Sequence, residues 1–218
     1  MFSTNIRASS SVQWREVTMR QVTGRSSKNS EKKASIRLAS GGRFFSASTL
    51  SSIAESGDVL VCIDTPRVTL IPASMASGIT AEQALSIVGL APQSGEIAIY
   101  SHKVEDRCAA IAIDSNAYGE LSKKFGNRLK FTTPLLSNSQ NITNHLAIEI
   151  SNGVCYLRLY TPGLKLAEAL EIETADELLF YVINFFEYAD ISRDIPIYII
   201  GGKEYVKRLK KYYKVICE

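Results

Sequence analysis

The chain has 218 residues, of which 45% are hydrophobic and 22% charged, and its formal net charge is +3. At about 100–200 residues per domain this length holds one domain or two small ones. The composition is that of a globular protein, which excludes global disorder, collagen and a coiled coil. No apolar run approaches the roughly 18 residues of a membrane helix, so we expect no membrane span.

The positive charge is concentrated in residues 1–33, which carry seven basic and two acidic side chains. The remaining 185 residues carry 18 basic and 20 acidic ones and are slightly negative. We interpret residues 1–33 as a flexible or partly ordered Ser-rich extension. A targeting peptide and an arm for nucleic acid or acidic lipid are the alternatives. Alternation around Val12 and Trp14 also fits a short strand.

The body begins with strand patterns. Strands at 34–39 and 43–48 flank Ser40-Gly41-Gly42, a hairpin turn in which glycine adopts positive φ without steric cost. The apolar run at 59–63 predicts a strand covered on both faces, and 67–71 predicts another.

Helices and strands alternate through the rest of the first half. Thr80 is the expected N-cap of a helix at 80–90, with an apolar side made of Ala84, Leu85, Ile87 and Val88. The further expected elements are strands at 96–101 and 107–114, a helix at 116–125 and an extended segment at 129–136. The polar stretch 137–141 is the best candidate for a domain boundary.

The second half opens like the first. Strands at 145–151 and 154–160 flank Asn152-Gly153, the strongest short hairpin signal, and a third strand follows at 163–172. Thr174 and Glu177 form a capping box for a helix that runs to about Ala189. The remaining expected elements are a strand at 195–200 ending in Gly201-Gly202, a helix at 203–213 and a strand at 215–217.

Each half therefore has the same order of elements: a hairpin, then helix and buried strand. This order predicts an α/β protein with two similar mixed-sheet halves, residues 34–140 and 141–218, preceded by the extension 1–33.

Three segments carry a resemblance to a known family: Ser35-Ile36-Arg37-Leu38-Ala39-Ser40-Gly41-Gly42-Arg43-Phe44-Phe45-Ser46, Val68-Thr69-Leu70-Ile71-Pro72 and Ile199-Ile200-Gly201-Gly202. Together with the duplicated order of elements, they make the chain resemble the actin-like ATPase superfamily of actin, sugar kinases and heat-shock chaperones, whose fold is ribonuclease H-like. More narrowly, it resembles an uncharacterised bacterial family of small proteins with a degenerate actin-like fold. The resemblance covers about residues 34–202.

The resemblance implies a lost activity. Active members carry an aspartate in an Asp-x-Gly turn of each opening hairpin, where it holds metal and phosphates. Here the turns read Ser40-Gly41-Gly42 and Ser151-Asn152-Gly153, without an aspartate. Because phosphoryl transfer depends on metal-assisted charge neutralisation, we expect no ATP hydrolysis. Gly201 and Gly202 match the turn that approaches adenosine, although a strand-to-helix turn needs glycine in any case.

Other chemistry has little support. The four cysteines are far apart and three lie in apolar runs, which indicates core packing in a reducing cytoplasm. His102 and Asp106 share a polar turn that we interpret as a solvated loop, and His145 has no partner nearby in the sequence. No metal-ligand spacing or nucleotide-binding loop motif appears, so we predict no catalytic residue and no metal site.

Three functional hypotheses follow. The first is a non-catalytic, actin-like interaction or scaffold protein with a protein partner and no cofactor. The second is a nucleotide-binding protein or ATPase that uses non-standard carboxylates such as Asp64, Asp114 or Glu149. The third is a nucleic-acid-binding module that uses the extension and the basic C-terminal helix, whose Lys and Tyr residues alternate.

Overall fold

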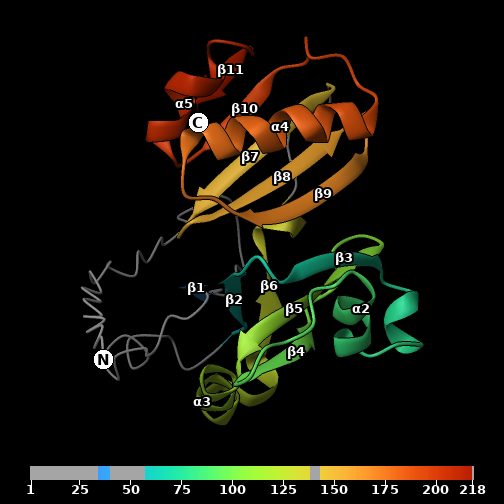
Figure 1. Cartoon of the computed structure of the whole chain (residues 1–218). Helices are drawn as coiled ribbons and strands as arrows, with labels where there is room; N and C mark the ends of the chain where they lie inside the picture. The colour runs from blue at the N-terminus through green and yellow to red at the C-terminus, as the bar shows by residue number, and fades with distance from the viewer. Residues whose placement is uncertain (1–33, 40–56, 138–142, 218) are drawn as a thin grey trace, which may run out of the picture.

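The computed structural model describes residues 34–39, 57–137 and 143–217. These residues form two bodies, one above the other in Figure 1; we call residues 34–39 and 57–137 the first half and residues 143–217 the second half. The predicted strand 43–48, the alternation around Val12 and Trp14, and residues 138–141 of the predicted boundary lie outside the described residues.

The described residues of the first half form two three-stranded sheets. One is parallel, with the order β1-β2-β6, and consists of β1 (Ala34–Ala39), β2 (Val59–Asp64) and β6 (Leu129–Thr132). The other is antiparallel, with the order β3-β5-β4, and consists of β3 (Val68–Pro72), β5 (Arg107–Asp114) and β4 (Glu96–Tyr100). The extended segment predicted at 129–136 is a strand only to Thr132, and a short 3-10 helix, η3 (Pro134–Leu136), follows.

In the described part of the chain, two α-helices accompany these sheets, α2 (Ala81–Ile87) and α3 (Ser115–Phe125). Thr80 caps α2 as the sequence predicts, since Gln83 N donates to Thr80 Oγ1 at 3.1 Å. Its predicted apolar side is half wrong: Ala84 and Leu85 are buried, but Ile87 and Val88 are 75% and 51% exposed. The helix ends at Ile87, so the chain turns away before these two residues can reach the sheet.

Residues 143–217, the described part of the second half, contain one five-stranded mixed sheet with the order β11-β10-β7-β8-β9. Its strands are β7 (His145–Ser151), β8 (Val154–Tyr160), β9 (Leu164–Glu171), β10 (Ile197–Ile200) and β11 (Val215–Cys217). The β7–β8 hairpin turns at Asn152 and Gly153, both with positive φ, as the Asn-Gly signal predicts.

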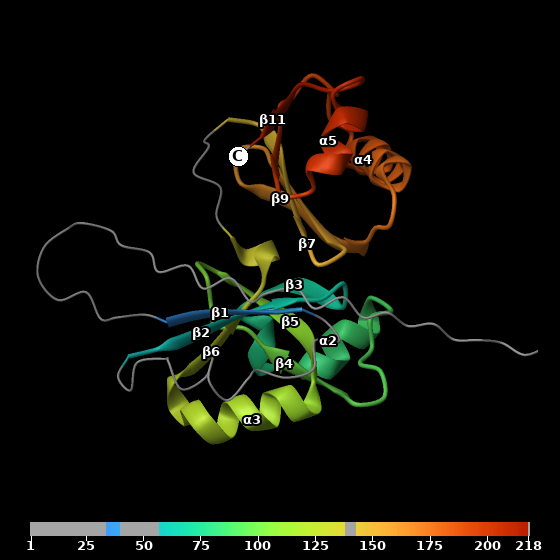
Figure 2. The same ribbon diagram turned by 90° about the vertical axis from the view of Figure 1, so that its left-hand side faces the viewer.

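The two helices α4 (Ala175–Ala189) and α5 (Lys203–Leu209) lie on the same face of this sheet (Figure 2). The capping box of Thr174 and Glu177 starts α4 as predicted. Helix α5 is four residues shorter than the predicted 203–213, because the chain turns after Leu209 to bring β11 parallel to β10.

The opposite face of the second sheet packs on the first half. Along β8, Cys155, Leu157 and Leu159 point into the core beneath α4, whereas Val154 and Tyr156 join the core of the first half. Alternate residues of a strand face opposite sides, so β8 is buried along its whole length. The two halves therefore share apolar packing across their junction.

Gly201 and Gly202 form the tight turn between β10 and α5, with φ values of 77° and 56°. A Cβ on Gly201 would lie 2.4 Å from the carbonyl oxygen of Ile150, and one on Gly202 would lie 2.6 Å from Ile150 Cδ1. The packing of this turn against the end of β7 requires both glycines.

Replacing Gly201 with alanine should destabilise the protein by about 2–4 kcal/mol, because positive φ and a backbone clash add together. Chemical denaturation measures this loss. Gly163→Ala is the matched control: its Cβ would meet nothing within 4 Å, so its effect should stay below about 0.5 kcal/mol. Equal stability of the two variants would contradict this account of the turn.

Candidate functional site

Two of the three carboxylates singled out in the sequence meet at the junction of the halves. Asp64 ends β2 and Glu149 lies on β7, and both are buried. Asp114 lies elsewhere and caps α3, where its Oδ1 accepts a hydrogen bond from Ala117 N at 2.8 Å. The carboxylate site is therefore a pair, and its members come from different halves.

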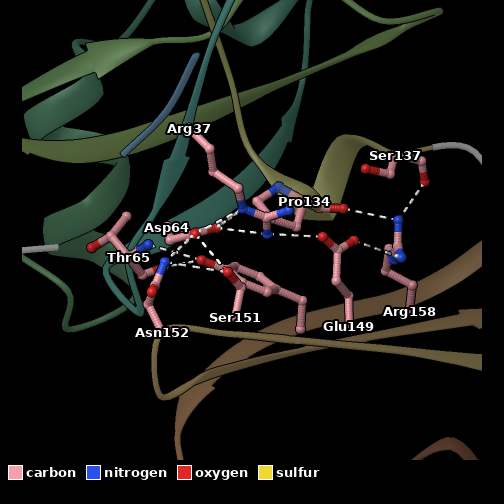
Figure 3. A network of polar contacts seen from close by, with 10 residues as sticks. Arg37, Asp64, Thr65, Pro134, Ser137, Glu149, Ser151, Asn152 and Arg158 are labelled. Carbon is pink, nitrogen blue, oxygen red and sulfur yellow. Dashed lines mark hydrogen bonds and ion pairs between the residues drawn. The ribbon is translucent and has the colours of Figure 1, made fainter. Parts of the chain in front are cut away.

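Arg37, on β1, joins the two carboxylates (Figure 3). Its Nε lies 2.8 Å from Asp64 Oδ2, and its Nη2 donates to Asp64 Oδ1 and to Glu149 Oε1, each at 2.8 Å. One guanidinium thus holds β2 of the first half and β7 of the second. Because the fork of Arg matches carboxylate geometry, this contact fixes orientation as well as charge.

A second arginine extends the chain of charges. Arg158, on β8, places Nη2 3.4 Å from Glu149 Oε2. Its Nη1 donates to the carbonyl oxygens of Pro134 at 2.9 Å and of Ser137 at 2.7 Å (Figure 3). Tyr160 also donates to the Ser137 carbonyl, at 3.1 Å. These bonds fasten the end of the first half to the second sheet.

The β7–β8 turn reaches the same carboxylate from the other side. Ser151 Oγ and Asn152 Nδ2 each donate to Asp64 Oδ2 at 2.8 Å. Beside them, Thr65 N donates to the hydroxyl of Tyr156 at 2.8 Å. The β7–β8 turn is therefore bound to a side chain of the protein itself.

Four alternating charges, Asp64, Arg37, Glu149 and Arg158, cross the junction and sum to zero. The Asp64 side chain is completely buried, whereas that of Arg37 is 38% exposed. Burial acts to lower the pKa of Arg37, but hydrogen bonds and charge from Asp64 and Glu149 outweigh it and raise the pKa above its usual range. Such pairing is what permits charges in a low-dielectric interior.

Cys62 lies on β2 opposite Arg37 in the parallel register. Burial raises the pKa of its thiol to about 12, despite the opposing charge of Arg37. Burial likewise raises the pKa of the Cys155 thiol to about 12. Both thiols are therefore protonated at neutral pH, the inert state of a core cysteine.

The junction offers little for metal binding. Asp64 accepts hydrogen bonds only from N–H and O–H groups, which would repel a cation. In the residues that the structure describes, no group of three His, Cys, Asp or Glu side chains is placed to hold a metal ion. The chemical effect of the network is that Arg37 and Arg158 neutralise the buried carboxylates of Asp64 and Glu149.

The other predicted site residues do not join this network. Gly201 and Gly202 pack on Ile150, and their predicted contact with adenosine stays a prediction. His102 Nδ1 lies 2.8 Å from the Phe131 carbonyl oxygen, and His145 is buried and stacked on Tyr160, with ring centroids 4.7 Å apart.

Sequence reasoning missed both arginines. Arg37 stands between Ile36 and Leu38, and Arg158 between Leu157 and Leu159. A charge within an apolar strand is a usable signal, because Arg is almost never buried without a partner.

Comparison with known proteins places the fold. No curated protein matches the chain, and no helix in its described part is long and apolar enough to cross a membrane. It is similar to a Bacteroides thetaiotaomicron protein with an actin-like ATPase fold and unknown function: the TM-score is 0.65 at 15% identity, over 79% of this chain and 72% of that one.

A weaker likeness, at TM-score 0.43 and 14% identity, covers 76% of this chain and 80% of the cytoplasmic domain of EpsL, an inner membrane component of the type II secretion system of Vibrio cholerae. The predicted α/β architecture and actin-like fold are thus confirmed by the Bacteroides structure. The family described as "Protein of unknown function (DUF3822)" matches residues 27–216, and the chain belongs to this family.

Proposed function

We propose that the protein is a non-catalytic, actin-like interaction or scaffold protein of the reducing cytoplasm. The observation that carries this proposal is the chain of charges from Asp64 to Arg158 at the junction of the halves. It lies at the hairpin turn that, by resemblance, serves metal and phosphates in active ATPases. A turn committed to an internal carboxylate is not free for that chemistry.

The packing of the halves also supports a non-catalytic role. Closure around a ligand requires two bodies that hinge or slide. Here Tyr156 is buried with Val154 in the core of the first half, and Arg37 ties β1 to β7. Opening the junction would expose both apolar surface and paired charges, so the arrangement favours a rigid body.

The outer side of α4 supports a role in binding another protein. Phe180 and Tyr188 are 61% and 83% exposed on this helix. Large aromatic side chains are enriched at protein interfaces relative to other surfaces. Their exposure suits a surface that is covered by a partner.

Titration with millimolar Mg²⁺–ATP tests the non-catalytic proposal. We expect no rise in melting temperature beyond that caused by magnesium sulfate at the same ionic strength, because the side-chain donors of the β7–β8 turn are already bonded to Asp64. A nucleotide present at 100 times its Kd would add about 2.7 kcal/mol of stability. A saturable rise of that size would refute the proposal.

The junction should contribute to stability through Arg37. Arg37→Met leaves Asp64 buried without its cation, so we expect a loss of about 2–4 kcal/mol in denaturant unfolding, moderated by the partial exposure of Arg37. Arg193→Met is the control, because it removes an exposed ion pair with Glu187 that should contribute at most about 1 kcal/mol. Similar losses in both variants would contradict a structural role for the network.

Nucleotide binding or ATP hydrolysis by non-standard carboxylates is the second candidate. The convergence of Asp64 and Glu149 favours it, although Arg37 binds both. If an ATPase rate is detected, replacing either residue with its amide should reduce it, whereas Asp114→Asn, remote from the pair, should not. An unchanged rate in the first two variants would dismiss this candidate.

Nucleic-acid binding is the third candidate. Five lysines of α5 and the turn after it are exposed: Lys203, Lys207, Lys210, Lys211 and Lys214. Phosphate contacts release counterions, so binding to single-stranded DNA should weaken steeply with salt and on deletion of residues 1–33. Fluorescence anisotropy that is indifferent to both changes would exclude this role.

A further inference from the structure

The Asp64 carboxylate is surrounded by donors from two halves of the protein. Five hydrogen bonds reach its two oxygens from three side chains, at 2.8–3.0 Å: three from Arg37, one from Ser151 and one from Asn152. An ionised carboxylate has about four lone-pair sites, so its capacity is filled. The Asp64 carboxylate is therefore surrounded by hydrogen-bond donors in the way that an anion is in a binding site.

The donors come from a turn and a strand rather than from the neighbours of Asp64 in sequence. Asn152 adopts positive φ at the tip of the β7–β8 hairpin, and its amide and the Ser151 hydroxyl point at the carboxylate (Figure 3). Arg37 is on β1, paired in parallel with β2. A hydroxyl, an amide N–H and a guanidinium all donate hydrogen bonds, so together they select an anion.

We propose that Arg37, Ser151 and Asn152 form an anion cradle whose resident ligand is the chain's own Asp64 carboxylate. Removing that carboxylate opens the cradle to a small oxyanion, of which formate, acetate and inorganic phosphate are the probes. Tethering gives the internal carboxylate a far higher effective concentration than a free anion in solution. In the natural protein Asp64 thus excludes external anions from the turn.

The charges around the cradle agree with this assignment. Without Asp64, the charged side chains left at the junction are Arg37, Glu149 and Arg158, whose charges sum to +1. Both arginines lie within 3.4 Å of Glu149. The Tyr156 hydroxyl is not one of the donors to Asp64, since it accepts a hydrogen bond from Thr65 N and donates to the Thr65 carbonyl oxygen. An anion of carboxylate size would restore neutrality and refill the donors.

The test is rescue of Asp64→Ala by anions. We expect this variant to melt at a lower temperature than the natural protein and to regain stability saturably with formate or acetate, relative to chloride at the same ionic strength. Asp114→Ala is the matched control, because it removes a carboxylate with one backbone donor. The natural protein and Asp114→Ala should show only the general salt effect.

Phosphate tests how selective the anion cradle is. If both formate and phosphate stabilise Asp64→Ala, the cradle binds oxyanions in general. If only formate stabilises it, the cradle is selective for carboxylates. In either case the rescue should disappear in Asp64→Ala combined with Ser151→Ala and Asn152→Ala. Equal anion effects on Asp64→Ala and the natural protein would overturn the proposal.

A second variant covers the case in which Asp64→Ala does not fold. Ser151→Ala/Asn152→Ala retains the Arg37–Asp64 pair and removes only the two turn donors, so its melting temperature should fall by about 4–10 °C. An unchanged melting temperature would overturn the cradle. The outcome is separate from the proposed function, which binding of Mg²⁺–ATP to the natural protein would refute whatever the anion experiment shows.

Discussion

The guanidinium of Arg37, held between Asp64 and Glu149, is the contact on which the junction of this protein depends. Its two carboxylate partners are buried and come from different halves, with Arg37 and Glu149 separated by 112 residues. A buried carboxylate without a cation is costly. Glu149 of the second half therefore depends on Arg37 of the first half for its 2.8 Å ion pair, and β1 cannot leave its place without depriving both carboxylates of this cation.

The Asp64 carboxylate that Arg37 binds also anchors the β7–β8 turn. This turn has tight Asn-Gly geometry, and the side chains of Ser151 and Asn152 donate hydrogen bonds to Asp64. A shared fold does not determine an activity, because activity resides in a few side chains placed on a scaffold. In this chain the turn side chains support the junction of the two halves.

Local signals predicted most elements well. The capping box of Thr174 and Glu177 starts α4 where expected, because a cap is an interaction between residues three apart. Asn152-Gly153 turns the hairpin for an equally local reason. The errors occur where long-range packing decides: Ile87 and Val88 have the right spacing for a buried side, but the chain leaves the sheet first.

The sequence by itself determined the order of elements, the duplicated α/β plan, the lack of an aspartate in either opening turn and the need for glycine after β10. Only the tertiary structure decided that Asp64 and Glu149 meet while Asp114 does not, and that Arg37 and Arg158 neutralise them. The physical reason is that strand patterns specify which side of a sheet a residue faces, whereas a buried charge is satisfied by whichever residue the packing of two halves brings within hydrogen-bonding distance.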